Sequence, residues 1–256
     1  MTLNNALEAT AITKVFGQGR NQVRALNSLS LSVRPGEFVA IMGPSGCGKS
    51  TLLHVMSGLT NVDSGRLAID GHDISTFNDQ QLTKFRRTHV GIVFQAFNLI
   101  TSLTAIDNVR LPMRDSSARR LRAAELLRLL GLEDRAHHRP AAMSGGEQQR
   151  VAIARALAND PAIVFADEPT GSLDSITGQK VCELLSDLCR EHGKTIVLVT
   201  HEPSVARWAS RILVMKDGQL VNDFPVDENA DGNWVATHYQ NSIASSQALQ
   251  SASEPN

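Results

Sequence analysis

The sequence predicts an α/β fold with a parallel sheet at its core, because short apolar runs alternate with amphipathic helical patterns. Continuous apolarity over so few residues is typical of strands buried on both faces of a parallel sheet. Four such runs span residues 38–42, 91–94, 162–166 and 195–199. Helical patterns over residues 146–158 and 176–191 separate the later runs, and this alternation indicates a parallel core.

Two further elements flank this core on its N-terminal and C-terminal sides. Residues 8–35 alternate between polar and apolar around a turn-rich segment at 17–21, which predicts a small β layer that precedes the core. After an apolar run at residues 212–215, the pair Asp217-Gly218 predicts a hairpin, because glycine supplies the positive φ of a tight turn.

The middle and the end of the chain carry no strand signal. Leucines at helical spacing over residues 118–130 predict a helical insert, which we place at about residues 97–145 of a main domain spanning 1–225. From residue 226 the chain contains neither Lys nor Arg and is rich in Ser, Ala, Gln and Asn. Residues 226–256 are therefore expected to form a polar, mobile tail.

Composition excludes several classes of function. A formal net charge of -1 provides no general attraction to nucleic acid. No apolar run approaches the roughly 18 residues of a membrane span, and the N-terminus lacks the features of a signal peptide, so a cytoplasmic location is expected. The three cysteines form neither a metal-ligand cluster nor a disulfide framework, and Cys182 and Cys189 are expected to be buried thiols.

The segment GPSGCGKST, from Gly43 to Thr51, fits the pattern G-x-x-x-x-G-K-[ST] between a predicted strand and a predicted helix. Glycines let backbone N–H groups converge on phosphate oxygens, and the helix N-terminus adds a favourable partial charge. We call this segment the phosphate loop. Lys49 is expected to contact the β- and γ-phosphates, Ser50 to bind magnesium and Thr51 to support the α-phosphate.

Asp167 and Glu168 end the apolar strand at residues 162–166, where a carboxylate is costly unless a cation compensates it. Asp167 is expected to hold Mg²⁺, directly or through water, and Glu168 to orient or deprotonate the water that attacks the γ-phosphate. An acidic pair at a strand end is more often a helix cap or a surface pair, but the phosphate loop upstream favours the catalytic interpretation.

Gln95 and His201 also follow predicted strands, at residues 91–94 and 195–200. Ligands of open α/β sheets bind at the carboxyl edge of the strands, where both side chains should emerge with Lys49 and Asp167. A lone Gln or His is usually structural, whereas two at this edge favour sensors of the γ-phosphate.

The segment MSGGEQQR contains a second potential anion site. Ser144 precedes Gly145-Gly146 and a strongly helical run, so it is expected to cap a helix whose N-terminus can bind an anion. The alternative is a capping turn without a ligand. The triphosphate of one nucleotide needs only one anion site, which the phosphate loop supplies. The second anion site at Ser144 therefore suggests binding to the nucleotide of another subunit.

In content and order these motifs resemble the ATP-binding-cassette (ABC) ATPases over about residues 9–221. The resemblance rests on the phosphate loop, Gln95, the signature SGGEQ at residues 144–148, Asp167-Glu168, GSLD at residues 171–174, and His201. It implies a RecA-like P-loop NTPase core with an N-terminal antiparallel β subdomain and an inserted helical subdomain. The implied activity is hydrolysis of ATP with Mg²⁺ as cofactor.

The resemblance also implies a role for each site residue in a head-to-tail dimer with two ATP molecules at its interface. Glu168, His201, Lys49 and Gln95 would be catalytic, and Ser50, Gln95 and Asp167 would bind the metal. Phe16 would stack on adenine, although Tyr is more usual there. The nucleotide-binding set would comprise Phe16, Gly43, Pro44, Ser45, Gly46, Cys47, Gly48, Lys49, Ser50 and Thr51 of one subunit and Ser144, Gly145, Gly146, Glu147 and Asp174 of the other.

Longer stretches resemble the ATPases of lipoprotein-releasing (Lol) and macrolide-exporting (Mac) systems. These stretches are MGPSGCGKSTLL, VGIVFQAFNLITSLTAIDNVRLPM and MSGGEQQRVAIARAL. The likeness implies a partner, an integral membrane permease with a large external domain, through which the chain would sit on the inner face of the cell membrane.

Two other classes of function were considered. One is a soluble ABC ATPase that acts on DNA or ribosomes, but the coiled-coil insert, zinc modules or second cassette usual in that class are missing from the sequence. The other is a cassette that binds ATP without hydrolysing it, and it is disfavoured because every catalytic position is filled. The transported substrate belongs to the permease and is not encoded here.

Overall fold

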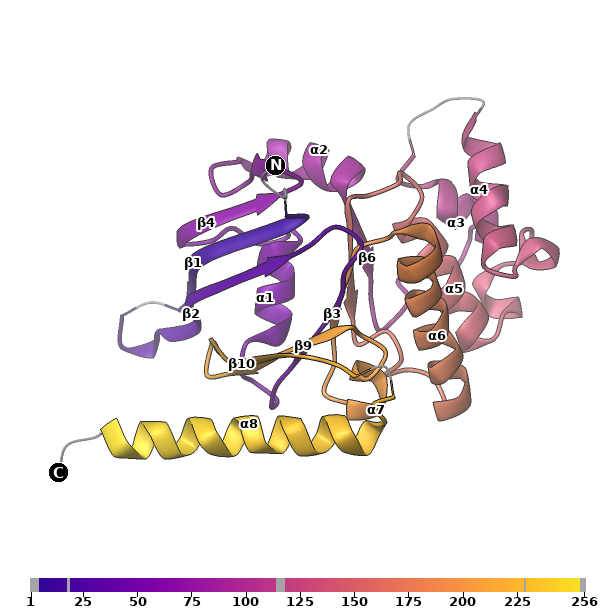
Figure 1. Cartoon of the computed structure of the whole chain (residues 1–256). Helices are drawn as coiled ribbons and strands as arrows, with labels where there is room; N and C mark the ends of the chain where they lie inside the picture. The colour runs from indigo at the N-terminus through magenta and orange to yellow at the C-terminus, as the bar shows by residue number, and fades with distance from the viewer. Residues whose placement is uncertain (1–4, 18, 114–117, 228, 254–256) are drawn as a thin grey trace.

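The computed structural model describes residues 5–17, 19–113, 118–227 and 229–253, which form two sheets and the helices around them (Figure 1). The smaller sheet is antiparallel, with the strand order β2-β1-β4-β5. Its strands are β1 Leu7–Phe16, β2 Val23–Val33, β4 Ser64–Ile69 and β5 His72–Asp73. The predicted N-terminal β layer is confirmed.

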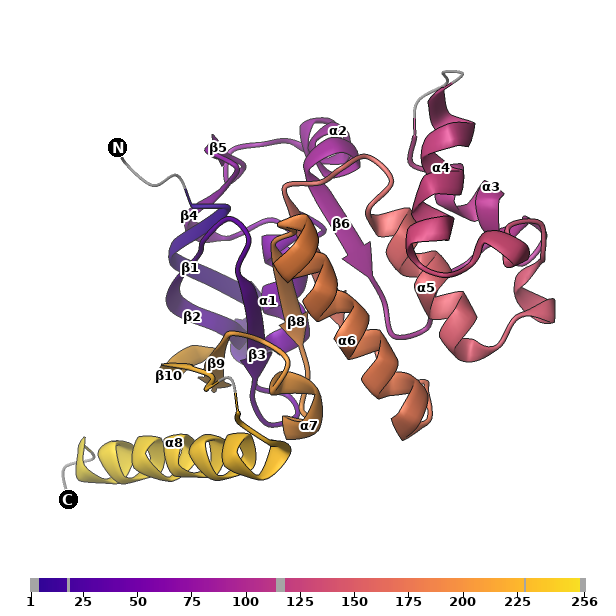
Figure 2. The same ribbon diagram turned by 45° about the vertical axis from the view of Figure 1, so that its right-hand side comes forward.

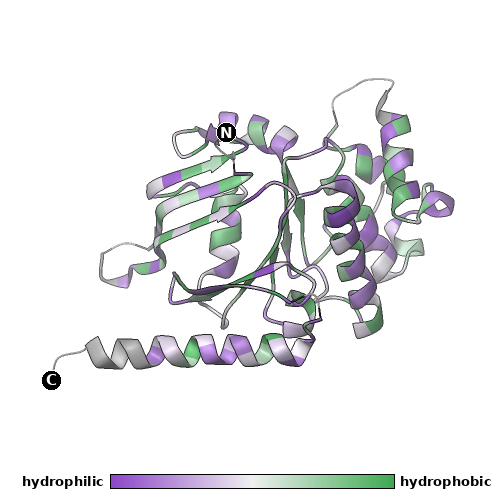
Figure 3. Ribbon diagram, viewed as in Figure 1, coloured by the Kyte–Doolittle hydropathy of each residue, from purple (hydrophilic) through white to green (hydrophobic). Residues whose placement is uncertain are grey.

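The larger sheet has six strands in the order β10-β9-β3-β8-β7-β6. All neighbours are parallel except β9 and β10, which form the predicted antiparallel hairpin around Asp217-Gly218. The strands are β3 Phe38–Met42, β6 Val90–Val93, β7 Ile163–Asp167, β8 Ile196–Val199, β9 Arg211–Lys216 and β10 Gln219–Pro225. Each predicted apolar run coincides with a strand to within one residue, and the parallel core is confirmed. Figure 3 colours these central strands mainly as hydrophobic.

Helices cover both faces of the parallel sheet, as an α/β fold requires. Several begin at residues whose side chains accept a hydrogen bond from the first turn, among them Asn78, Ser144 and Asp174. The helices are α1 Lys49–Met56, α2 Asp79–His89, α3 Ala105–Arg110, α4 Ala118–Leu129, α5 Gly145–Ala156, α6 Ser175–His192, α7 Pro203–Ala206 and α8 Gly232–Ser253. Short 3₁₀ turns lie at Gly19–Asn21, Glu133–Arg135 and Pro140–Ala142.

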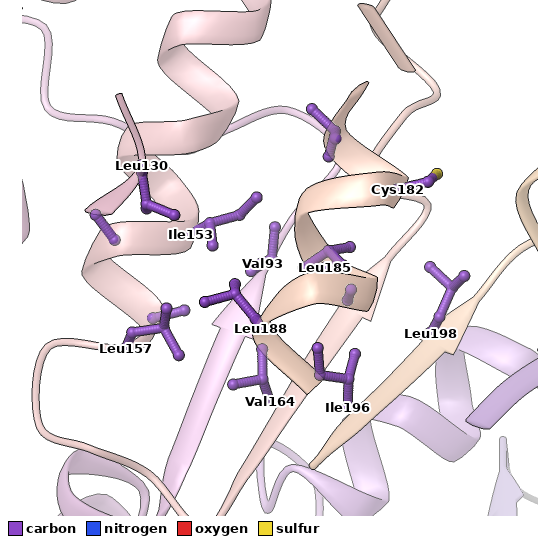
Figure 4. Close-up of a cluster of buried hydrophobic side chains, with 14 of the residues drawn as sticks. Val93, Leu130, Ile153, Leu157, Val164, Cys182, Leu185, Leu188, Ile196 and Leu198 are labelled. Atoms are coloured by element: carbon purple, nitrogen blue, oxygen red, sulfur yellow. The ribbon is translucent and has the colours of Figure 1, made fainter. Parts of the chain in front are cut away.

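Two apolar cores lie on opposite faces of the six-stranded sheet. One joins this sheet to the antiparallel sheet through α1, and Leu52 and Leu53 of that helix are fully buried in it. The other lies under α5 and α6, where Leu185 and Leu188 pack against strand residues such as Val164 (Figure 4). Burial raises the pKa of the Cys182 thiol in this core to about 12, in agreement with a structural thiol, whereas Cys189 is only half-buried, contrary to expectation.

The expected helical insert consists of α3, α4 and the 3₁₀ turns that follow, and it lies to one side of the core next to α5 (Figure 2). Leu126, Leu127 and Leu130 bury the apolar side of α4. Buried Asn108 hydrogen-bonds main-chain groups of Ile100 and Thr104, and so fixes the loop before α3. The boundary at about 97–145 remains a prediction.

The expectation of a mobile tail after residue 226 is corrected by α8. Its inner face presents Trp234, Val235, His238, Tyr239 and Ser242, which follow each other at helical spacing. Val235 is fully buried and Ser242 is nearly so, and Asn222 of β10 donates a 2.8 Å hydrogen bond to the Ser242 hydroxyl. Polar composition concealed this helix because the helix needs only one narrow apolar stripe to dock.

Candidate functional site

The phosphate loop connects β3 to α1, and two of its glycines, Gly43 and Gly48, are sterically required. A Cβ added to Gly43 would lie 2.3 Å from the Met215 carbonyl oxygen. Gly48 has a φ of +104°, and a Cβ there would lie 2.3 Å from the carbonyl oxygen of Ala25. The loop is therefore pressed between β9 and β2 and held at the N-terminus of α1, where backbone N–H groups favour an anion.

Lys49 is the first residue of α1 and is only 8% exposed. Its ammonium group donates hydrogen bonds to the carbonyl oxygens of Gly43 and Pro44, at 2.8 and 2.9 Å. These bonds hold the charge inside the loop. The basic group thus lies where the sequence predicts a phosphate contact.

A cleft of about 530 Å³ opens beside the loop, within the size range of small-molecule sites. Its lining residues are Phe16, Val23, Arg24, Ala25, Gly46, Cys47, Gly48, Lys49, Ser50, Thr51, Asp217 and Gly218. Phe16 is 47% exposed, and the Lys14 ammonium lies 5.6 Å from the centre of its ring. An exposed aromatic ring beside a phosphate loop has the position that stacking on a base requires.

Cys47 is a buried part of the loop, and only 4% of it is exposed. Burial raises the pKa of its thiol, and this effect outweighs the opposing charge of Lys49. The Cys47 carbonyl oxygen accepts a 3.0 Å hydrogen bond from the backbone N–H of Gly218. The hairpin turn between β9 and β10 is thus fastened to the loop.

The acidic pair lies at the carboxyl edge of the sheet, as predicted. Asp167 pairs with Val199 of the neighbouring strand β8. Burial raises the pKa of Asp167, His54 and Lys49 oppose this shift, and Glu168 adds to it. A half-buried carboxylate whose ionised form is disfavoured in the free protein is well suited to a cation ligand.

Glu168 adopts a left-handed backbone conformation with φ of 43°. Its backbone N–H donates a 2.9 Å hydrogen bond to the Val199 carbonyl oxygen. Its carboxylate Oε1 lies 2.9 Å from Nδ1 of His201. The structure therefore brings Glu168 and His201 into one hydrogen-bonded pair at the strand ends.

Gln95 follows β6, and its amide packs against the glycine of the GSLD segment. A Cβ on Gly171 would lie 2.6 Å from Gln95 Nε2, so the amide of Gln95 lies directly against this glycine. The sequence analysis missed two residues that fix these loops. The fully buried Gln149 donates a 2.7 Å hydrogen bond to the Pro169 carbonyl oxygen. Arg155 Nη2 donates to the Phe97 carbonyl oxygen at 2.8 Å.

The signal for these two residues is weak, because an amide and a guanidinium inside a helical pattern are normally read as solvent-facing. Gln149 stands among the buried residues of α5, a position that an apolar side chain would usually occupy. His54 of α1, whose charge lowers the pKa of Asp167, was also missed.

The signature segment forms a second helix N-terminus. The Ser144 hydroxyl accepts a hydrogen bond from the Glu147 backbone N–H, and the Glu147 carboxylate accepts one at 2.8 Å from the Ser144 N–H. This bond, together with Arg135, whose Nε lies 3.0 Å from Glu147 Oε1, holds the pKa of Glu147 below its ordinary value. The capping prediction is confirmed in its local geometry.

The signature lies next to α6 and away from the cleft. A Cβ on Gly146 would lie 2.4 Å from Thr177 Cγ2, and Asp174 caps α6 by accepting a 3.0 Å hydrogen bond from the Thr177 N–H. Hydrogen bonding from the Thr177 side chain, together with this backbone bond, lowers the pKa of Asp174. None of the cleft-lining residues comes from the segment 143–150, within the described part of the chain.

Gly48→Ala is expected to destabilise the free protein and to weaken nucleotide binding strongly. The new methyl group would meet the Ala25 carbonyl oxygen, and the positive φ alone costs about 1–3 kcal/mol for a residue with a side chain. Gly46→Ala is the matched control, because Gly46 also has a positive φ but no atom within 4 Å of its added Cβ. Chemical denaturation and ATP titration of the two variants would check this, and equal losses would contradict the steric explanation.

The fold and this arrangement of loops define an ATP-binding cassette, an ATPase of the ABC type. A protein-family model described as ABC transporter matches residues 26–171, and the chain belongs to this family. The match supports a role with a transporter over the alternative of a soluble ATPase acting on DNA or ribosomes. In the described part of the chain, none of the helices combines the length and the apolarity that crossing a membrane requires.

Relatives of two kinds are similar to the chain. An uncharacterized ABC transporter ATP-binding protein of Methanocaldococcus jannaschii is 48% identical over 84% of this chain and 97% of its own length. The macrolide export ATP-binding/permease protein MacB of Chlorobaculum tepidum is 47% identical over 85% of this chain but only 34% of its own length. This confirms the resemblance to ABC and Mac-type ATPases; a specific likeness to Lol-type ATPases was not found among these relatives.

Among solved structures, the cassette MJ0796 in a dimeric post-hydrolysis state bound to ADP and Pi is similar to this chain. The TM-score is 0.78 at 45% sequence identity, and the match covers 86% of this chain and 99% of that chain. A second structure, described as the dimeric structure of the same cassette, matches equally well.

Proposed function

We propose that the chain is the ATP-hydrolysing subunit of a transporter, that it works as a head-to-tail dimer of cassettes, and that it drives an integral membrane permease. The observation that carries the proposal is the presence of two separate anion-binding helix N-termini. That of α1 faces the cleft, whereas that of α5, capped by Ser144, lies outside the cleft lining. A second copy turned head to tail would bring Ser144, Gly145 and Gly146 to the first copy's nucleotide.

Support for this arrangement comes from the relatives. MJ0796 was solved as a dimer, and the MacB proteins carry an ATP-binding and a permease part in one chain. In the proposed dimer, Glu147 and Asp174 would lie at the interface with the Ser144 segment, because α5 and α6 begin side by side. The partner permease would supply the membrane attachment at the inner face of the cell membrane.

We assign the magnesium ion to Ser50, Asp167 and Gln95. Hydroxyl, carboxylate and amide oxygens are ligands that Mg²⁺ prefers, and a cation would stabilise the half-buried Asp167 carboxylate in its charged form. Bound there, Mg²⁺ would neutralise charge on the phosphates. The raised pKa of Asp167 means that protons compete with the metal more strongly as the pH falls.

Within this site each remaining residue has a distinct task. The Lys49 ammonium binds the β- and γ-phosphates beside the backbone N–H groups of residues 43–51, and Phe16 stacks on the base. Glu168 takes a proton from the attacking water, and His201 holds the Glu168 carboxylate in place and contacts the γ-phosphate. Gln95 links the metal to the helical insert through its loop.

We assign the partner permease to the type that has a large external domain, as in macrolide export or lipoprotein release. It rests on the similarity to MacB proteins and on the sequence stretches around the phosphate loop, Gln95 and the signature. The cargo would be determined by the permease.

Co-purification tests the proposal. Tagged chain recovered from detergent-solubilised membranes of its own host is expected to bring an integral membrane protein in constant ratio, and that protein should remain bound at high salt. Recovery of ribosomes or DNA in place of a membrane protein would refute the assignment to a transporter. The Lys49→Ala variant, in which nucleotide binding is weakened, serves as the control that shows whether association with the membrane protein depends on the nucleotide.

A further inference from the structure

Three side chains with metal-binding atoms converge at the edge of the molecule opposite to the nucleotide cleft. They are Asp70 and His72, in and just after the turn between β4 and β5, and His89, the last residue of α2. One ligand atom of each lies within 4.8 Å of those of the other two. Figure 2 shows β5 and α2 at the top of the molecule, whereas α7 and the hairpin β9-β10 lie towards its lower end.

The ring of His89 is fixed with one nitrogen available. Its Nδ1 lies 3.3 Å from the Phe85 carbonyl oxygen and 2.8 Å from the Thr88 hydroxyl. These contacts orient the ring, and in the tautomer that carries its proton on Nδ1, where it can donate to the Phe85 carbonyl oxygen, Nε2 keeps a lone pair for a metal. Histidines that bind metals are commonly oriented in this way, by an Nδ1–H bond to a main-chain carbonyl.

Contacts between aromatic rings hold His72 and His89 next to each other. His89 stacks on Phe85 with the ring centres 4.3 Å apart and an angle of 3° between the planes. His72 meets His89 edge-on at 5.0 Å and Phe85 at 5.7 Å. Phe85 is nearly buried. The two imidazoles are thus placed side by side on a rigid apolar base.

Asp70 completes the set from a constrained turn. Its φ is 49°, and its backbone N–H donates a 3.0 Å hydrogen bond to the Ala6 carbonyl oxygen. Asp70 and His89 also line one cavity of about 490 Å³. Lys194 at that cavity forms an ion pair with Asp160. The Asp70 carboxylate and the His89 imidazole therefore line one solvent-connected space, and the exposed His72 lies next to His89.

We propose that Asp70, His72 and His89 form a binding site for a divalent transition-metal ion, with Zn²⁺ as the preferred occupant. Two imidazole nitrogens and one carboxylate oxygen suit zinc, nickel and copper, whereas Mg²⁺ prefers an all-oxygen set. Ligands of a tetrahedral zinc ion with bonds of about 2.1 Å lie roughly 3.4 Å apart. The ligand atoms lie within 4.8 Å of one another and would move closer together around the ion, which the exposed side chains of Asp70 and His72 leave room for. Water would supply the fourth ligand.

This site is separate from ATP hydrolysis, because none of its residues lines the nucleotide cleft or contacts Asp167 among the described residues. The ion would connect β5 of the antiparallel sheet to the junction between α2 and β6 of the parallel sheet. Metal binding is thus expected to stabilise the fold while leaving basal ATP turnover unchanged.

A cobalt titration of metal-free protein in excess Mg²⁺ tests the proposal, with Co²⁺ as a coloured substitute for Zn²⁺. The wild-type chain is expected to bind one equivalent of Co²⁺ with a visible absorption band that Zn²⁺ displaces. His72→Gln and His89→Gln should each weaken binding by at least about tenfold. Asp70→Asn should weaken it while keeping the turn, because Asn tolerates a positive φ.

His192→Gln is the matched control, because it removes an exposed histidine from the end of α6 and keeps every cysteine. Thermal unfolding provides a second readout: Zn²⁺ should raise the melting temperature of the wild-type and His192→Gln proteins and leave that of His72→Gln unchanged. Equal metal affinity in the wild type and in His72→Gln, or no stoichiometric binding at all, would overturn the proposal. If His89→Gln fails to fold, the exposed His72 still decides the question.

Discussion

Glu168→Gln should bind ATP, form a stable dimer and lose at least about a hundredfold in turnover, the typical contribution of a general base. The substitution keeps the size and shape of the side chain and removes only its basicity. The glutamine amide can still hydrogen-bond to His201 across the 2.9 Å contact, and the left-handed backbone at this position is unchanged. Loss of turnover would therefore reflect the loss of the general base and not a structural change in the site.

The measurement is single-turnover hydrolysis combined with size-exclusion chromatography in ATP. A dimer that holds unhydrolysed ATP supports the assignment of Glu168 as the base. His201→Ala is the comparison, because it removes the partner and leaves the carboxylate, and it is expected to retain more turnover than Glu168→Gln. A Glu168→Gln protein that hydrolyses ATP at the wild-type rate would show that another group activates the water.

Two inactive variants, Lys49→Ala and Ser144→Arg, are expected to restore activity when they are mixed. In a head-to-tail dimer, each active site combines the phosphate loop of one chain with the signature of the other. A heterodimer of the two variants then contains one site with both substitutions and one intact site. At random pairing half of the dimers are mixed, so about a quarter of the wild-type sites are regained.

The control for this mixture is Lys49→Ala combined with a chain that carries both substitutions, since no pairing of these chains contains an intact site. Steady-state ATP hydrolysis before and after mixing provides the readout, and each protein should first show a normal unfolding transition. Absence of restoration in the first mixture, with heterodimers verified, would contradict a site shared between chains.

The catalytic edge was the part of the fold most open to prediction. Buried parallel strands have short, continuous apolar runs, and the residues that follow each run must emerge at one edge. Residues such as Gln95, Asp167 and His201 could therefore be placed together before any coordinates were known. The left-handed backbone of Glu168 and the close approach of Gln95 to Gly171 could not be predicted, because they depend on which segments approach each other in space.

Residues 57–89 yielded no prediction, although they contain β4, β5 and α2. The first half of β4 is exposed and β5 has two residues, so neither shows a usable apolar period. In α2 only Leu82 and Phe85 are buried among polar and charged residues, so the segment is too polar overall to stand out as part of the core. Helix α8 was missed for a related reason: its docking stripe is built from Trp, His and Tyr among many small polar residues.

The strand order has a consequence for the synthesis of this protein on the ribosome. Strand β3 and the phosphate loop are among the first elements made, yet the neighbours of β3 are β8 and β9, which begin at Ile196 and Arg211. The backbone N–H and C=O groups of β3 thus stay without their strand partners while more than half of the chain is synthesised, and strand pairing over such distances in sequence is slow. A nascent cassette should become competent to hold ATP only near the end of translation, so premature nucleotide binding is prevented by topology alone.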